Sequence, residues 1–559
     1  MSVAIEQKEK LASLIRNAVQ QIIDDGEFII DQPVPDIHLE IPRDKTHGDF
    51  ASNIALVLAK PAKRAPRQVA DLIVAYLADQ EFIRKVEVAG PGFINFFISS
   101  KWLHQVLETI ELEGLNYGFT NYGQGEKVLV EFVSANPVGP MNVVNARAAA
   151  IGDTVARLMR AAGYKVATEY YVNDAGVQTE VFGRSLAARF RQLTSNDFPF
   201  PDDGYPGDYL KDLAQKLAQE PQDFIGMSES ELIDFCRTWG INEMIAMQRA
   251  DLVEFDVEFD RWFREQELHK AGALEQVIGR LEANGYMYSQ DGALWFRSTA
   301  FGDDKDRVII KTDGSYTYVT ADIAYHYDKL QRGFTKLIDL LGPDHHGYIG
   351  RMKAAVQALG YKEDALEVLI LQYVALLRNG QQVKMSKRAG EFITLQDLLD
   401  EVGKDAARYF FLMRSMESHL DFDLTLAAEQ SSDNPVFYIQ YAHARICSIL
   451  QQASEQGLPL IPATEAPLEA LDKEAELDLM KKLAELPEEI MTAAIHREPH
   501  RIARYALELA SVFHSFYTHC HILGEEGEIR TARLTLIFSV RIVLQRVLAL
   551  LGISAPDRM

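Results

Sequence analysis

The spacing of hydrophobic residues indicates a small mixed domain at the start of the chain. Apolar residues three or four positions apart predict helices at 6–23, 66–78 and from residue 101 onward, and the segment 47–60 is expected to place a glycine turn before an apolar helix. Strict alternation predicts a strand at 37–41, and two further strands are expected at 86–98, on either side of a Gly-Pro-Gly turn. We therefore expect a compact α+β domain over residues 1–115.

A strand, a turn-rich loop and a helix are expected in residues 127–153. The β-branched run 127–133 predicts the strand, and apolar residues at helical spacing follow a loop rich in proline and glycine. A second strand is expected at 165–171. The chain then has a mostly helical pattern that includes the acidic aromatic run FDVEFDRWF, and we interpret about 177–290 as a helical insertion.

Strand patterns return after the insertion. They lie at 292–297, 307–311, 316–320, 337–341 and 369–377. Asp313-Gly314 and Asn379-Gly380 predict hairpin turns. Beyond about Asp405 only helices are expected, the last at 530–551.

This order of elements predicts the fold class. Strands that alternate with helices favour a Rossmann-type parallel sheet, here in a domain over 116–415 that carries the helical insertion. The small α+β domain precedes it, and an all-α domain over 416–559 is expected to follow.

Composition narrows the class of protein. The 559 residues suffice for several domains, and 47% hydrophobic with 25% charged residues is typical of soluble globular proteins. Three scattered cysteines argue for a reducing cytoplasm and against disulfides or a cysteine-rich zinc site. No apolar run approaches the length of a membrane span, and no signal peptide pattern is present. The net charge of -24 counts against a nucleic-acid partner, although an acidic enzyme can carry a local basic track.

The unit at 127–153 is the first candidate for chemistry. Phosphates and small substrates bind where a strand of an open α/β sheet ends and a helix begins. An ordinary connection between strand and helix is the more frequent explanation of this pattern alone.

A second string, VKMSKRAGEF at 383–392, changes that balance. Lys384, Lys387 and Arg388 gather positive charge beside Ser386 in a loop that follows a predicted hairpin. A loop with two lysines can close over a triphosphate and offset the charge that develops as pyrophosphate leaves. The alternative for an isolated KxxKR is a solvated basic turn.

Together these strings resemble the class I aminoacyl-tRNA synthetases, and specifically the arginyl-tRNA synthetase family. HGDFASNIA and GPGFINF resemble its N-terminal tRNA-contacting domain, and EFVSANPVGP, EYYVNDAG, FDVEFDRWF, DKDRVIIKTDGSYTYVTADIAYH and GPDHHGY its catalytic domain. KMSKRAG resembles its second ATP loop, while DNPVFYIQYAHARICSI and the terminal LGISAPDRM resemble its all-helical anticodon-binding domain.

The resemblance implies an arginine-tRNA ligase. ATP, with Mg²⁺, and arginine would give arginyl-adenylate and pyrophosphate, and the arginyl group would pass to the 3' end of the arginine tRNA. A cytoplasmic monomer without a prosthetic group or membrane is implied.

The resemblance also implies the site residues. Arginine would be held by Glu131, Ser134, Asn136, Tyr318 and Asp322. Carboxylates suit the planar donors of a guanidinium, and that geometry discriminates against lysine. ATP would be held by Pro137, Gly139, Asn142, Val144, Asn145, His345, His346, Met385, Ser386 and Lys387. The residues at catalytic positions would be Lys384, Lys387, Asn142 and Asn145.

Four arginines are candidates for tRNA phosphate contacts, the alternative being a solvated basic face: Arg445, Arg497, Arg501 and Arg504. No metal site is expected, because His345 and His346 lack neighbouring ligands at metal-binding spacing. His514, His519, Cys520 and His521 do not share one helical face.

One motif departs from the family. Its first ATP motif ends in His-x-Gly-His, whereas this chain has Asn142, Val143, Val144 and Asn145. Losing one charge-assisted hydrogen bond costs about 1.5–3 kcal/mol, roughly 10- to 150-fold in rate if it acts at the transition state. Val144 would also place an isopropyl group where the family's glycine lets adenine lie against the backbone.

Two hypotheses follow from this departure. The first is a working ligase with weak adenylation, supported by the second ATP loop and the arginine pocket. The second is a catalytically impaired relative that binds tRNA or arginine as a regulatory protein, which only the altered motif supports.

Overall fold

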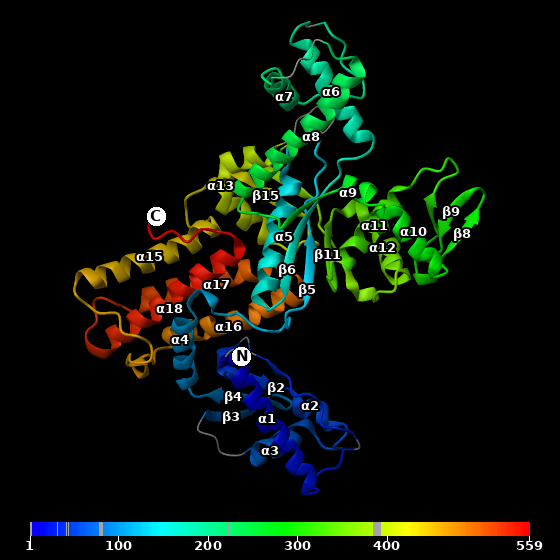
Figure 1. Ribbon diagram of the computed structural model, residues 1–559. Coiled ribbons are helices and arrows are strands. Elements are labelled where there is room, and N and C mark those ends of the chain that lie inside the picture. The colour runs from blue at the N-terminus through cyan, green and yellow to red at the C-terminus, as the bar shows by residue number, and fades with distance from the viewer. Residues whose placement is uncertain are drawn as a thin grey trace.

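The computed structural model of the chain describes residues 3–30, 32–40, 42, 44–77, 82–195, 197–221, 224, 226–383 and 393–559. A central sheet joins the other parts, with the N-terminal domain (blue) below it, the helical insertion (green) above it and the C-terminal helices (orange and red) beside it (Figure 1).

The central sheet has five parallel strands in the order β12, β11, β5, β6, β7. Their bounds are β5 (Lys127–Glu131), β6 (Lys165–Val172), β7 (Arg261–Arg264), β11 (Lys336–Leu341) and β12 (Leu366–Ile370). Helix α5 (Val143–Ala161) packs against β5 and β6, and α12 (His346–Ala358) packs against β12. Both faces are covered, which explains why strands such as β5 and β11 are mostly apolar, with the buried Asp339 as the exception within β11. The parallel sheet predicted from the sequence is confirmed.

The N-terminal domain combines a four-stranded antiparallel sheet with helices. Its elements are α1 (Val3–Asp24), β1 (Leu39–Glu40), β2 (Phe50–Ser52), α2 (Ile54–Ala59), α3 (Pro66–Tyr76), β3 (Ile83–Ala89), β4 (Phe93–Ile98) and α4 (Lys101–Glu113). The apolar helix expected within 47–60 is α2, and the strand β2, which was not predicted, lies between it and the glycine turn and pairs with β4. At Gly48 the backbone has a φ of +86°, and a Cβ there would lie 2.6 Å from the carbonyl oxygen of Phe96.

The helical insertion is shorter than predicted. Its helices are α6 (Val177–Gln192), α7 (Tyr209–Leu217) and α8 (Glu229–Glu254). The aromatic run that follows contains β7, which pairs in parallel with β6 and forms an edge of the central sheet. The ring of Trp262 on β7 stacks on Tyr170 of β6 at 4.1 Å between centroids. Packing of the aromatic side chains against the sheet therefore fixes this run as a strand rather than a helix.

Two small sheets flank the second half of the central domain. One contains β8 (Met287–Gln290), β9 (Ala293–Phe296) and β10 (Arg307–Ile310); the other contains β13 (Val374–Arg378), β14 (Gln381–Gln382) and β15 (Leu420–Asp423). The strand expected at 316–320 was wrong, since Tyr316 forms a single bridge and α11 (Tyr318–Gln331) begins two residues later. The expectation that strands end at about Asp405 was also wrong, because β15 pairs in parallel with β13.

Helices fill the rest of the chain. They are α9 (Glu265–Lys270), α10 (Ala273–Ala283), α13 (Leu395–Leu412), α14 (Leu424–Ala428), α15 (Pro435–Glu455), α16 (Glu474–His496), α17 (His500–His519) and α18 (Gly527–Leu551). Among the described helices, α18 alone is long and apolar enough to cross a bilayer, but 72% of its apolar window is buried. It packs against α15 and α17 as a core helix.

One buried arginine connects three parts of the fold. Arg408 of α13 is fully buried and donates to the Asp153 carboxylate at 2.5 Å, to the carbonyl of Phe255 at 3.0 Å and to the carbonyl of Leu551 at 2.7 Å. A Cβ at Gly552 would lie 2.3 Å from the guanidinium carbon, so glycine is required there. This contact joins α5, the end of the insertion and the end of α18.

Candidate functional site

A cavity of about 440 Å³ opens where β5 and β11 end. Its wall includes Glu131, Ser134, Asn136, Asp322 and His345, all of which the sequence nominated. These side chains come from the β5 loop, α11 and the turn before α12, which meet at the carboxyl edge of the parallel sheet. Tyr318 is not in this wall; its side chain is 74% exposed at the start of α11.

The loop after β5 has an unusual backbone. Val133 and Ser134 have φ values of +67° and +40°, and such a conformation costs a β-branched residue on the order of 1–3 kcal/mol. Ser134 stabilises it, because its hydroxyl donates to Glu131 at 2.9 Å and accepts the N–H of Tyr171 at 3.1 Å. The strained turn brings Ser134 and Asn136 to the cavity, and it could not be predicted from the sequence.

Buried polar residues from the insertion hold the next part of this loop. The amide of Gln248 is buried and donates to the carbonyls of Asn136 at 3.2 Å and Gly139 at 3.0 Å. The hydroxyl of Tyr209 donates to the carbonyl of Val138 at 2.6 Å. The insertion therefore fixes the loop that contains Pro137 and Gly139.

The carboxylates around the cavity differ in their hydrogen-bond partners and in the direction of their pKa shifts. Glu131 is buried and accepts the ammonium of Lys329 at 2.5 Å, yet burial raises its pKa. Asp322 has no side-chain hydrogen bond to a described residue, and burial raises its pKa to about 7, which His326 and Arg351 partly oppose. Although burial acts against it, the pKa of Asp339 is held below its ordinary value by Lys329 and His326.

The variant first ATP motif caps α5. The side chain of Asn142 accepts the N–H groups of Val144 at 2.9 Å and Asn145 at 3.2 Å, and the side chain of Asn145 accepts the N–H of Asn142 at 3.1 Å. The two asparagines thus satisfy backbone donors that an anion at this helix start would use. The two side chains that would replace the family's imidazoles in contacting ATP are therefore already engaged in capping α5.

The second ATP loop lies outside the described residues, including Lys384, Met385, Ser386, Lys387 and Arg388. The chain on its far side is close to the first motif, because Thr394 forms a bridge with Asn142 and the N–H of Leu395 donates to the carbonyl of Met141 at 2.8 Å. Of His346 only the backbone is described, as the first residue of α12.

Arg147, fully buried in α5, connects this helix to a neighbouring small sheet. Its guanidinium donates to the carbonyls of Gln372 at 2.8 Å, and of Ser415 and Ser418 at 3.1 Å each. These carbonyls precede β13 and β15. This role could not be predicted from the sequence, since a lone arginine in a helix is usually exposed.

The four candidate tRNA arginines have different surroundings. Arg445 lies over the rings of Tyr441 and Tyr517, each at 4.8 Å from the centroid. Arg497 is 7% exposed and donates to the Glu367 carboxylate at 3.2 Å. Arg501 pairs with Glu489 at 3.1 Å, and Arg504, whose side chain is 55% exposed, lies 3.7 Å from Glu508. Arg497 and Arg501 are thus engaged within the protein.

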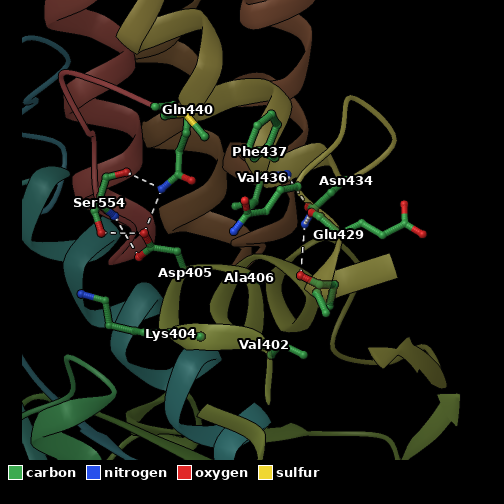
Figure 2. Close-up of a pocket in the computed structure, with 15 residues that line it drawn as sticks. Val402, Lys404, Asp405, Ala406, Glu429, Asn434, Val436, Phe437, Gln440 and Ser554 are labelled. Carbon is green, nitrogen blue, oxygen red and sulfur yellow. Dashed lines mark hydrogen bonds between the residues drawn. The ribbon is translucent and has the colours of Figure 1, made fainter. Parts of the chain in front are cut away.

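A second cavity, of about 510 Å³, lies between α13, α15 and the last residues of the chain (Figure 2). Asp405 accepts hydrogen bonds from Gln440 at 2.8 Å and from the Ser554 hydroxyl at 2.6 Å, as Figure 2 shows. These contacts fasten the C-terminal segment to the start of α15 and to α13.

Among the described residues one group could hold a metal ion: His443, Cys447 and Asp557. The thiol donates to Asp557 at 3.4 Å, and a ring nitrogen of His443 donates to the Pro556 carbonyl at 2.9 Å. Burial raises the pKa of Cys447 to about 11, which disfavours the thiolate that a metal requires. We interpret the group as hydrogen bonds that fasten the C-terminal segment.

Comparisons with known proteins agree with this geometry. Family models match three segments: the arginyl tRNA synthetase N terminal domain at 9–98, the catalytic domain of class I (R) tRNA synthetases at 108–419, and the DALR anticodon binding domain at 439–559. The chain is 48% identical to the arginine--tRNA ligases of Symbiobacterium thermophilum and Moorella thermoacetica, over 100% of each chain. The fold is also that of Thermus thermophilus arginyl-tRNA synthetase, with a TM-score of 0.75 at 21% identity over 99% of this chain and 100% of that one. The chain therefore belongs to the arginyl-tRNA synthetase family.

Proposed function

We propose that the protein is an arginine-tRNA ligase that forms arginyl-adenylate and transfers arginine to its tRNA. Its full-length relatives carry that name, and the cavity supports it. The observation that carries the proposal is the meeting of Glu131, Asn136 and Asp322 in one cavity at the carboxyl edge of the parallel sheet. Acyl transfer through a mixed anhydride needs positioning and phosphate stabilisation, which such a site provides.

Asp322 is the proposed main acceptor of the arginine guanidinium. Its carboxylate lines the cavity and has no side-chain hydrogen bond to a described residue, whereas Glu131 is already paired with Lys329. Glu131, which Ser134 orients, would accept further donors of the same guanidinium. Asn136 would hydrogen-bond to arginine, and Tyr318 would cover the substrate from the start of α11.

ATP is proposed to bind across the start of α5 and the turn before α12. Pro137, Gly139, Asn142, Val144 and Asn145 form the first side, and His345 and His346 form the second. The segment with Lys384, Met385, Ser386 and Lys387 would supply positive charge to the phosphates. Mg²⁺ prefers oxygen ligands and keeps substrate phosphates and waters in its shell; the exposed carboxylate Asp344 in the cavity wall fits such an ion.

The tRNA is proposed to contact the N-terminal and C-terminal domains, expected over 1–115 and 416–559 on either side of 116–415. Arg445 and Arg504 are the better candidates for phosphate contacts. Arg445 lies over tyrosine rings, and the side chain of Arg504 is 55% exposed despite its pair with Glu508, whereas Arg497 and Arg501 are less exposed and pair with acidic residues. The protein is proposed to act in the cytoplasm as a monomer.

Arginine- and tRNA-dependent exchange of pyrophosphate into ATP tests this function, together with charging of arginine tRNA. Both reactions are expected, and Asp322→Asn should weaken them through the arginine KM. Matched reactions with lysine in place of arginine should give no exchange. Tight tRNA binding without any exchange or charging would instead support the regulatory protein, which only the altered first motif favours.

A further inference from the structure

A chain of buried charges lies directly behind the arginine pocket. Lys329 of α11 is fully buried, and its ammonium donates to Glu131 at 2.5 Å and to Asp339 at 3.0 Å. Its remaining side faces the ring of Tyr325, 4.2 Å from the centroid. The buried ammonium therefore lies against two carboxylates and one aromatic face.

His326 extends this chain to the other pocket carboxylate. One ring nitrogen lies 2.7 Å from Asp339, and the other lies 2.7 Å from the backbone carbonyl of Asp322. Both partners are oxygen acceptors, so the ring of His326 connects Asp339 to the backbone of Asp322. Lys329 and His326 thus join Glu131, Asp339 and Asp322 in one buried network.

We propose that Lys329 is a positioning residue of the arginine site, which keeps Glu131 ionised and holds its carboxylate in one orientation. The proposal rests on the proposed arginine-tRNA ligase function and deepens it. One Glu131 oxygen is held by Lys329 and the other takes the Ser134 hydroxyl at 2.9 Å, so the carboxylate cannot rotate freely. Only its remaining lone pairs face the cavity, which fixes the direction from which a planar guanidinium can approach.

Removing Lys329 would leave two buried carboxylates, Glu131 and Asp339, without their shared cation. At least one of them then takes up a proton at neutral pH. The other groups around Glu131 are His326, Tyr325 and Asp322 on α11, Tyr171 on β6 and Tyr348 on α12. Of these only His326 can carry positive charge, and its ring is already hydrogen-bonded to Asp339. Protonated Glu131 would no longer accept a guanidinium with full charge.

The test measures arginine binding by calorimetry on the full chain, with and without arginine tRNA, for the parent, Lys329→Met and a matched control. Lys353→Met is that control, since Lys353 forms a surface pair at 3.8 Å outside the cavity wall. Lys329→Met should raise the arginine Kd roughly 10- to 100-fold, as expected for the loss of one charge-assisted hydrogen bond. Its arginine affinity should rise with pH more steeply than that of the parent, as Glu131 regains charge. In pyrophosphate exchange, its KM for ATP should change at least tenfold less than its KM for arginine.

The variant Lys329→Met/Asp339→Asn covers the case in which the single variant does not fold. It removes one cation and one anion, yet still leaves Glu131 without its ammonium, so weak arginine binding should persist. Parental arginine affinity in either folded variant, or equal losses for arginine and ATP with an unchanged pH profile, would overturn the positioning role alone. Absence of arginine binding by the parent would overturn the ligase function and the positioning role together.

Discussion

Restoring the family's first ATP motif should raise the rate of adenylation and lower stability. In Asn142→His/Val144→Gly/Asn145→His, each imidazole regains a donor toward the phosphates, worth roughly 10- to 150-fold in rate. The same change removes both halves of the capping box on α5, in which Asn142 accepts at 2.9 Å and 3.2 Å and Asn145 at 3.1 Å. A lost N-cap costs about 1 kcal/mol, so the variant should be about 2 kcal/mol less stable if both caps count.

Pyrophosphate exchange with saturating arginine and tRNA measures the rate, and urea unfolding measures the stability. Ser228→Ala is the matched control, because it removes the N-cap of α8 far from the cavity. The Ser228→Ala variant should lose a similar free energy of unfolding per cap, and its rate of pyrophosphate exchange should not rise. Full exchange by the parent with no gain on restoration would refute the reasoning that the asparagines weaken the ATP site.

Three further predictions concern charge and buried arginines. Because the pKa of Asp322 is raised to about 7, this carboxylate is neutral below that pH and charged above it. The arginine Kd should therefore rise about tenfold per pH unit as the pH falls below 7. A Kd that calorimetry finds constant from pH 5.5 to 8 would contradict this prediction. Arg147→Met leaves the carbonyls of Gln372, Ser415 and Ser418 without their donor and should cost about 2–4 kcal/mol in urea unfolding, against little change for exposed Arg504→Met. Arg408→Leu removes a buried partner of Asp153 and should cost about 3 kcal/mol by the same assay; a loss below 1 kcal/mol would show that Arg157 alone satisfies that carboxylate.

The sequence predicted the elements whose local pattern matches their surroundings. β5 and β11 are apolar runs buried on both faces, and the Asn379-Gly380 hairpin has the positive φ values that its residues favour. β7 was missed because its identity as a strand depends on packing of Trp262 against Tyr170, which lie far apart in sequence. β15 was missed because a run of four residues between helices carries little signal.

The sequence predicted the site residues that belong to motifs, but not those that depend on contacts between distant parts of the chain. Glu131, Asn136 and Asp322 were nominated from motifs and meet in one cavity, as the position of strand ends in a parallel sheet implies. Lys329 carried no signal, since it looks like any lysine in an amphipathic helix and meets Glu131 from 198 positions away. The capping by Asn142 and Asn145 could have been predicted from the local sequence. Asn is favoured at the start of a helix, and a side-chain amide three residues later can complete a capping box.

The contact of Arg408 also bears on the order in which the chain can complete its packing during synthesis. Its guanidinium donates to the carbonyl of Leu551, which is made 143 residues later. Until the end of α18 is made, the buried end of α13 lacks one of its hydrogen-bond acceptors, and the contact between these two helices cannot form. Chains that end before Leu551 should therefore be cleaved by proteases near α13 faster than the full chain.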